Sequence, residues 1–295
     1  MKEKSQRLKK NKGVKNEDLT PMSPLNGRPS LPSEIHPQSL ASKTAWSAAA
    51  SVCSLFGRLI AQIVIARMLG PEGFGRIVYM VWLIEIGNVC SNFGLPGTLT
   101  RYLAELHGQG KKEQAHVFAQ WVYLRYTGLA LAGSIAVGVL FFNSSQYAGL
   151  ESALPLLMLL FLTRGLQTIN QADLAGQQRF DLLTRINVVA TIALLAGVCI
   201  GGYFYGVAGV LFGYVTGAVF PALYSFSMLR GFSFRKKMDG ALRRRVMKFA
   251  VNTWMAMVVS AFVWSRMEIF FLERYWNPHE VAMFTVGLTF AMMIR

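Results

Sequence analysis

Long apolar runs recur along the chain, and they restrict it to a membrane fold. An eighth run begins near 281, after seven that lie at about 46–69, 75–97, 117–142, 153–175, 185–205, 207–229 and 247–272. Each of the seven has roughly 21–26 residues, and a helix needs about 20 apolar residues to cross the hydrocarbon core of a bilayer. The composition agrees, because 53% of the residues are hydrophobic and only 15% are charged. The sequence therefore predicts an all-α, polytopic integral membrane protein built as a helical bundle.

Basic residues fall almost entirely on one side of the predicted spans. If the N-terminus is cytoplasmic, the cytoplasmic segments hold 22 Lys and Arg residues and the opposite loops hold two, Arg76 and Arg274. Cytoplasmic loops of membrane proteins are enriched in Lys and Arg. We therefore expect a multi-pass protein of the cytoplasmic (inner) membrane with its N-terminus inside. The net charge of +15 then reflects orientation and attraction to anionic lipid rather than nucleic-acid binding.

The runs divide the chain into four regions. Residues 1–43 hold nine of the 30 basic residues and five of the ten prolines without a sustained apolar period, which is typical of a disordered tail. Residues 44–230 hold six predicted spans, which form a first transmembrane lobe. A basic cytoplasmic loop at 231–246 leads to the start of a second lobe at 247–295.

A weak internal repeat indicates that the two lobes are related. RMLGPEGFGRIVY begins at Arg67 and RYWNPHEVAMFTV begins at Arg274, which aligns Pro71 with Pro278. Each segment follows a span that carries an arginine and opens the next span on the outer side. Transporters are often built from such repeats, with the substrate site between them. We expect the chain to hold one full repeat, span 7 and part of span 8, and to be the N-terminal portion of a longer protein.

Charged side chains lie inside several predicted spans. Arg58, Glu85 and Arg164 are close to the middle of spans 1, 2 and 4, and Arg266 and Glu268 lie in span 7. A charge at the bilayer centre costs roughly 2.5–3.5 kcal/mol, so such residues face the interior of a bundle or an aqueous cavity.

Polar residues accompany two of these arginines at helical spacing. Positions three and four apart share one face of a helix. Such stripes are formed in span 1 by Ser47, Ser51, Ser54, Arg58 and Gln62, and in span 4 by Arg164, Gln167, Thr168 and Gln171. Two stripes centred on arginines predict a wet, cationic cavity, and guanidinium groups match phosphate bidentately. We expect an anionic cargo that carries phosphate or carboxylate. The candidate binding residues are Arg58, Arg164, Ser54, Gln62, Gln167, Gln171 and Arg266.

The acids Glu85 and Glu268 have two interpretations. Either could couple transport to a proton or another cation, or could simply pair with an arginine. A pair between Glu85 and Arg58 would tie spans 1 and 2 together and would make both residues structural. Arg164 has no evident acid at its depth in the membrane, which favours a functional role for that arginine.

Glycines in spans 5 and 6 recur every four residues. Gly197 and Gly201 lie in span 5, and Gly209, Gly213 and Gly217 lie in span 6. Such stripes let transmembrane helices approach closely, so we expect these two spans to pack together.

The sequence shows no catalytic or metal-binding pattern. Three cysteines fall inside apolar runs and four histidines are scattered without the spacing of metal ligands. No Ser/His/acid set and no phosphate-binding Gly-rich loop can be read, and Asp173, Asp181 and Glu105 are isolated at the cytoplasmic ends of spans. We therefore expect a protein that is not an enzyme and that needs neither a metal nor another cofactor.

Four segments resemble a known family. They are ARMLGPEGFG at 66–75, NFGLPGTLTRYLAE at 92–105, AGQQRFDLLTRINVV at 175–189 and RRRVMKFAVNTWMAM at 243–257. The chain from about 45 to 295 resembles the oligosaccharide/polysaccharide flippase family, a branch of the multidrug/oligosaccharidyl-lipid/polysaccharide exporter superfamily. The long N-terminal tail departs from this family.

The resemblance implies two six-helix lobes around a cavity that opens to each side in turn. The cargo would be a polyprenyl-pyrophosphate-linked oligosaccharide, moved from the inner to the outer leaflet, and the partners would be the bilayer and a polysaccharide polymerase machinery. Arg58 and Arg164 match the family's cavity arginines. Two alternatives remain. An ion-coupled multidrug antiporter of the same superfamily would need more midplane acids for a cationic cargo. A membrane-embedded glycolipid transferase would need a cluster of acids or histidines.

Overall fold

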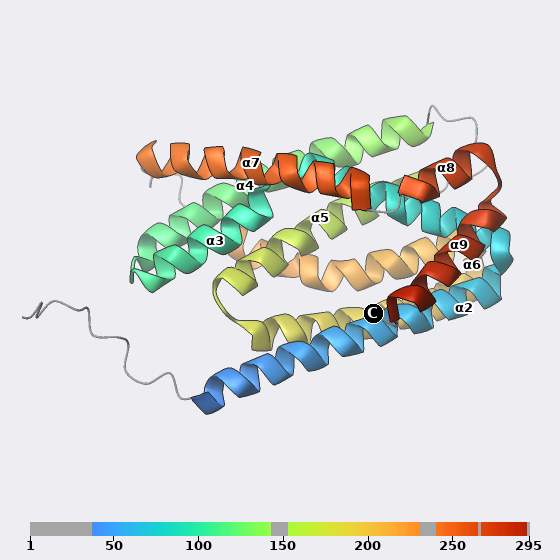
Figure 1. The fold of residues 1–295 in the computed structure, drawn as a ribbon, viewed down its shortest axis with the longest axis horizontal. Helices are drawn as coiled ribbons and strands as arrows, with labels where there is room; N and C mark the ends of the chain where they lie inside the picture. The colour runs from blue at the N-terminus through green and yellow to red at the C-terminus, as the bar shows by residue number, and fades with distance from the viewer. Residues whose placement is uncertain (1–36, 143–152, 231–239, 265–266, 294–295) are drawn as a thin grey trace, which may run out of the picture. The chain divides into compact units, whose positions relative to one another are not determined.

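The computed structural model describes residues 37–142, 153–230, 240–264 and 267–293, and in these residues the chain forms eight helices and no strand (Figure 1). The helices are α2 (Pro37–Ser91), α3 (Leu95–Gly108), α4 (Lys112–Phe142), α5 (Leu154–Gly176), α6 (Phe180–Arg230), α7 (Gly240–Trp264), α8 (Met267–Tyr275) and α9 (Pro278–Met293). The chain divides into two units, 1–42 and 43–295. Most of the predicted tail lies outside the described residues, and helices α3 to α9 belong entirely to the second unit.

Four helical stretches are long and apolar enough to cross a membrane, and they are Leu55–Ser91, Lys112–Phe142, Phe180–Tyr224 and Leu242–Val263. The first and third have 37 and 45 residues, which is about twice the length that one crossing needs. The prediction of an all-α polytopic membrane protein is therefore confirmed.

A glycine turn divides each of the two longest helices into antiparallel halves. Gly70 in α2 has φ +68° and Gly206 in α6 has φ +57°. Residues other than glycine rarely adopt such angles, so each turn depends on its glycine. The predicted breaks after residue 69 and at 206 are thus confirmed. A Cβ on Gly206 would lie 4.0 Å from Leu69 Cδ2, which places the two turns side by side.

The predicted end of span 2 at residue 97 was wrong. Helix α2 ends at Ser91, and α3 begins at Leu95 after a turn in which the Gly94 N–H donates to Asn92 Oδ1 at 2.8 Å. The apolar run continues through this turn, so hydropathy alone gave no sign of the break. Pro96 then falls in the first turn of α3, where a missing N–H is tolerated.

The predicted boundaries of span 7 also differ from the structure. Helix α7 begins at Gly240, inside the stretch 231–246 that was predicted as a loop. The remainder of the predicted span, which ended at 272, falls partly in α8. The start of span 8 near 281 agrees with α9.

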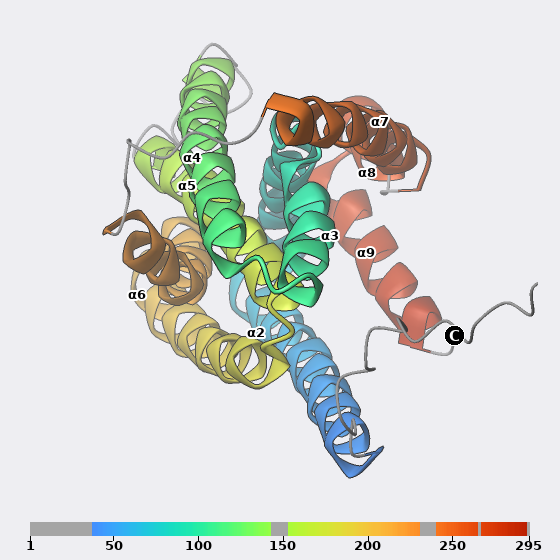
Figure 2. The same ribbon diagram turned by 90° about the vertical axis from the view of Figure 1, so that its left-hand side faces the viewer.

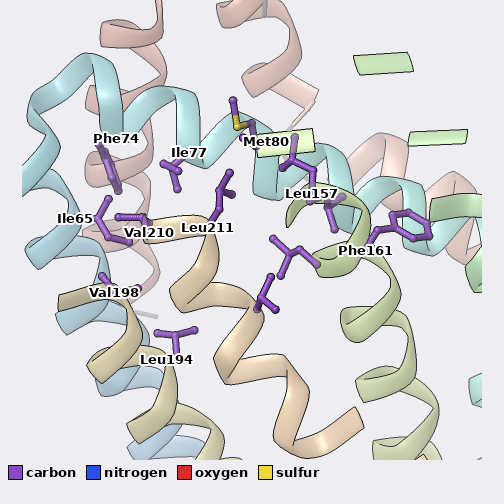
Figure 3. Close-up of a cluster of buried hydrophobic side chains, with 14 of the residues drawn as sticks. Ile65, Phe74, Ile77, Met80, Leu157, Phe161, Leu194, Val198, Val210 and Leu211 are labelled. Carbon is purple, nitrogen blue, oxygen red and sulfur yellow. The ribbon is translucent and has the colours of Figure 1, made fainter. Parts of the chain in front are cut away.

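Helix α5 contributes to two hydrophobic clusters. The first is shown in Figure 3, where Leu157 and Phe161 of α5 meet Met80 of α2 and Leu211 of α6. The second joins α3, α4, α5 and α7 around Phe118, Tyr123 and Ile169, among others. Helix α5 packs against α3, α4 and α6 and so lies within the bundle (Figure 2). Its side chains Arg164, Gln167 and Gln171 are half-buried.

The two halves of α6 approach closely through the predicted glycine stripes. A Cβ on Gly197 would lie 2.7 Å from Gly213 Cα, and one on Gly201 would lie 2.9 Å from the Gly209 carbonyl carbon. No real Cβ tolerates contacts this short against backbone, so the prediction of close packing between these segments is confirmed.

Replacing Gly213 by Val should force the halves of α6 apart. Overpacking costs about 1–3 kcal/mol, and we expect the upper end because the obstructing atoms are backbone. The thermal unfolding midpoint of the purified full-length protein should fall accordingly. Gly128→Val in α4 is the matched control, because a Cβ there meets nothing within 4 Å. Equal midpoints for the two variants would contradict the packing argument.

Candidate functional site

Arg164 lies midway along α5 and is partly buried. Its Nη1 donates to Gln167 Oε1 at 3.3 Å, and its guanidinium carbon lies 5.8 Å from the ring centroid of Tyr214 in the second half of α6. These contacts orient the guanidinium between two helices, and several of its five donors remain available to a ligand.

Glu85, in the second half of α2, belongs to the same neighbourhood. Its charge and that of Arg164 both act on the Tyr214 hydroxyl. Arg164 therefore has an acid nearby that periodicity within one span could not reveal, since the two positions lie on different helices. Arg58 and Glu85 are both described and form no ion pair with each other, although Arg58 makes other contacts.

The polar stripe of the first half of α2 faces two neighbours. Gln62 Oε1 accepts a hydrogen bond from the Thr289 hydroxyl of α9 at 3.4 Å. Arg58, one turn earlier, is exposed, and a Cβ on the adjacent Gly57 would lie 3.6 Å from Thr191 Cβ of α6. Ser54 lies on the same helix, but its side chain is outside the described part of the structure.

One segment of α6 connects the two predicted stripes. Gln171 Nε2 of α5 donates to Asn187 Oδ1 of α6 at 3.4 Å. Thr191, one turn further along α6, packs against Gly57 beside Arg58. The structure thus brings the α2 stripe and the α5 stripe to the same helix, which periodicity within either span could not show.

The residues of span 7 are not joined to this group by any described contact. Glu268 is exposed in the first turn of α8, and Arg266 lies outside the described residues. Among the described residues, no group of three or more His, Cys, Asp or Glu side chains could hold a metal ion. The group combines arginines, amides and hydroxyls with the acid Glu85, and its guanidinium groups can bind anions through charge-assisted hydrogen bonds.

A sequence profile of a family described as polysaccharide biosynthesis protein matches residues 64–295. The chain belongs to this family. The match runs from the first half of α2 through α9 and so includes the candidate group from Glu85 onward, which confirms the family predicted from the four motifs. The chain matches no curated protein and no solved structure.

In this polysaccharide biosynthesis protein, two of the motifs meet where α3 packs against α7. Trp254 Nε1 donates to the Cys90 carbonyl at 3.0 Å, and its ring stacks on Phe93 with centroids 4.9 Å apart. Arg101 lies 4.4 Å from the Phe249 ring centroid. We call this set the α3–α7 junction, and sequence reasoning missed it because the partners are far apart along the chain.

An ion pair also joins α3 and α7 at this junction. Arg245 Nη1 lies 3.2 Å from Glu105 Oε1, although both side chains are partly exposed. Such a pair contributes little stability by itself. Its position matters more, because it joins the end of α3 to the first turns of α7.

A buried acid, Asp173, was also missed. In the sequence it stands isolated at a helix end, whereas the structure gives it 0% exposure near the end of α5. Its Oδ2 accepts a hydrogen bond from Gln177 Nε2 at 3.0 Å, and its Oδ1 has no hydrogen-bond partner. One turn before it, Asn170 Oδ1 accepts from the Tyr123 hydroxyl at 2.8 Å.

Proposed function

We propose that this member of the polysaccharide biosynthesis family is a flippase of the cytoplasmic membrane. It moves a polyprenyl-pyrophosphate-linked oligosaccharide from the inner to the outer leaflet, with the N-terminus of the chain in the cytoplasm. The observation that carries the proposal is the setting of Arg164. Its guanidinium lies inside an apolar bundle, fixed by an amide and an aromatic ring, and it forms no ion pair within the described residues.

The chemistry of the cargo fits this setting. A pyrophosphate offers several anionic oxygens, and guanidinium binds such groups with charge-assisted bonds. Arg58 and Arg164 hold the head group, while Gln62, Gln167 and Gln171 supply neutral donors and acceptors for pyrophosphate and sugar. The prenyl chain stays in the lipid, so the protein shelters only the polar part.

Movement follows from alternating access rather than from a chemical step. The head group binds while the cavity is open to the cytoplasm, the lobes rock, and the head group leaves on the outer side. No bond is made or broken, so the protein is not an enzyme in this scheme. A polysaccharide polymerase machinery then takes up the exposed repeat unit.

Binding of a polyprenyl pyrophosphate to the purified full-length protein tests the role of Arg164. Removing one charged hydrogen-bonding partner costs about 1.5–3 kcal/mol, so Arg164→Gln should weaken binding roughly 10- to 100-fold. The affinity of Arg164→Lys should lie between those of wild type and Arg164→Gln, because lysine keeps the charge and loses the bidentate fork.

A polyprenol without phosphate is the matched ligand control, and its binding should not change in either variant. Equal binding of the pyrophosphate by wild type and Arg164→Gln would remove the main support for an anionic cargo. Resistance of cells to cationic drugs would favour the antiporter, and a new lipid-linked product in reconstituted membranes would favour the transferase.

A further inference from the structure

A buried carboxyl group lies apart from the arginines, at the far end of α5. Asp173 is nine residues beyond Arg164 on this helix, which is about 13 Å along the axis. It has no exposed surface, and only one of its two oxygens has a hydrogen-bond partner, the Gln177 amide at 3.0 Å.

Besides α5, three helices contribute groups around Asp173. Tyr123 of α4 lies beside the carboxylate but donates its hydroxyl proton to Asn170. Tyr224 of α6 lies near enough to interact with it electrostatically. The basic side chains of His107 in α3 and His116 in α4 lie near enough to interact with Asp173 electrostatically. Both histidines are exposed.

An ionised Asp173 is poorly supported in this environment. Desolvation of a buried carboxylate costs several kcal/mol unless charged or hydrogen-bonding partners repay it. Here the Gln177 amide donates to it, and the Tyr123 hydroxyl also lies close to the carboxylate, although that hydroxyl donates to Asn170. A buried acid in this position lowers its free energy by binding a proton.

A metal ion suits the site less well than a proton. Cations such as Ca²⁺ and Mg²⁺ need six or more oxygen ligands. Asp173 offers one unoccupied oxygen, and the neighbouring Asn170 oxygen already accepts from Tyr123.

We propose that Asp173 is a proton-binding site that couples proton movement to transport. The carboxyl group is protonated while α3, α4, α5 and α6 are packed as described, and it releases its proton toward His107 and His116 when these helix ends separate. The coupling role rests on the proposed flippase function, whereas proton binding does not. Glu85 and Glu268, the two acids that the sequence offered either for coupling or for pairing with an arginine, are both exposed, whereas Asp173 is buried.

Infrared difference spectroscopy of the full-length protein tests proton binding without any transport. The carbonyl stretch of a protonated carboxylic acid should be present in wild type at neutral pH, should bleach as the pH is raised, and should be missing in Asp173→Asn. Glu273→Gln is the matched control because Glu273 is the other acid with a buried oxygen that lacks a partner, among the residues the structure describes. If the band is lost in Glu273→Gln and kept in Asp173→Asn, it does not belong to Asp173. A wild-type spectrum without the band would also refute proton binding by Asp173.

Flipping by proteoliposomes tests the coupling. A pH gradient should change the wild-type rate about 5-fold or more, which is the lower range of coupling between two sites. Asp173→Asn should flip at one rate with and without the gradient. A variant that still responds to the gradient would refute coupling through Asp173 and leave the flippase function standing. If wild type shows the infrared band but does not flip the lipid, the function and the coupling are refuted and the proton site stands.

Discussion

Cells that carry Arg58→Gln and Arg164→Gln together in the full-length protein should lose their surface polysaccharide while the protein remains at its normal level. In the proposed function each guanidinium would supply charged hydrogen bonds to the pyrophosphate, and losing one would cost about 1.5–3 kcal/mol. The two losses together weaken head-group binding roughly 10²- to 10⁴-fold. Surface polysaccharide and membrane-inserted protein are measured in the same cells.

The control for charge is a second pair of arginines. Arg67 in α2 and Arg125 in α4 are both exposed, and Arg125 lies 4.5 Å from the Trp121 ring centroid instead of facing Tyr214. The double variant Arg67→Gln, Arg125→Gln removes the same charge and should export normally. Normal export by the Arg58, Arg164 double variant would refute the role of these arginines in cargo binding.

Replacing Trp254 by Ala should produce the largest loss of stability in the described part of the chain. The indole both stacks on Phe93 and donates to the Cys90 carbonyl, which lies in the last turn of α2 where carbonyls lack a helical partner. Truncating a packed Trp to Ala costs about 3–5 kcal/mol. The thermal unfolding midpoint of the purified full-length protein measures this loss.

Two further variants separate stacking from hydrogen bonding at this site. Trp254→Phe keeps an aromatic ring and leaves the Cys90 carbonyl unpaired, so it should cost about 1–3 kcal/mol. Trp276→Ala removes an exposed Trp from the turn before α9 and should change little. If Trp254→Ala unfolds at the wild-type temperature, the α3–α7 junction does not stabilise the protein.

The sequence predicted the helical turns well where a glycine set them. Gly70 precedes a proline between two apolar runs, and Gly206 separates two others, so both breaks are visible as interruptions in hydropathy and backbone preference. The glycine stripes were equally informative, because glycines four residues apart lie on one face of a helix and let a neighbouring helix approach closely.

The break at 92–94 could not be predicted in the same way. The apolar run continues through it, and contacts with α7 add to the local hydrogen bond from the Gly94 N–H to Asn92 Oδ1. Trp254 and the backbone of Ala250 in α7 pack against this turn, and a Cβ on Gly94 would lie 3.0 Å from the Trp254 nitrogen. The contacts with α7 leave no signal in hydropathy, and the local signal is limited to the turn-forming residues Asn92, Gly94 and Pro96.

The candidate site was predicted in its parts but not in its arrangement. Periodicity placed Gln167 and Gln171 on the same face of span 4 as Arg164. It did not show that Arg164 contacts the Tyr214 ring, or that Glu85 also interacts with Tyr214 electrostatically. Asp173 gave no signal because no charged residue stands beside it in sequence. Its burial arises from four helices that meet around it, and burial is a property of the fold.

A flipping assay tests most directly the proposal that the protein carries a lipid-linked oligosaccharide across the bilayer. Proteoliposomes with the full-length protein would hold a polyprenyl-pyrophosphate-linked oligosaccharide in one leaflet, with a glycosidase or lectin outside the vesicle. We expect the sugar to become accessible with wild type, and far more slowly with the Arg58, Arg164 double variant. Accessibility equal to that of protein-free vesicles, with correctly folded protein present, would contradict it.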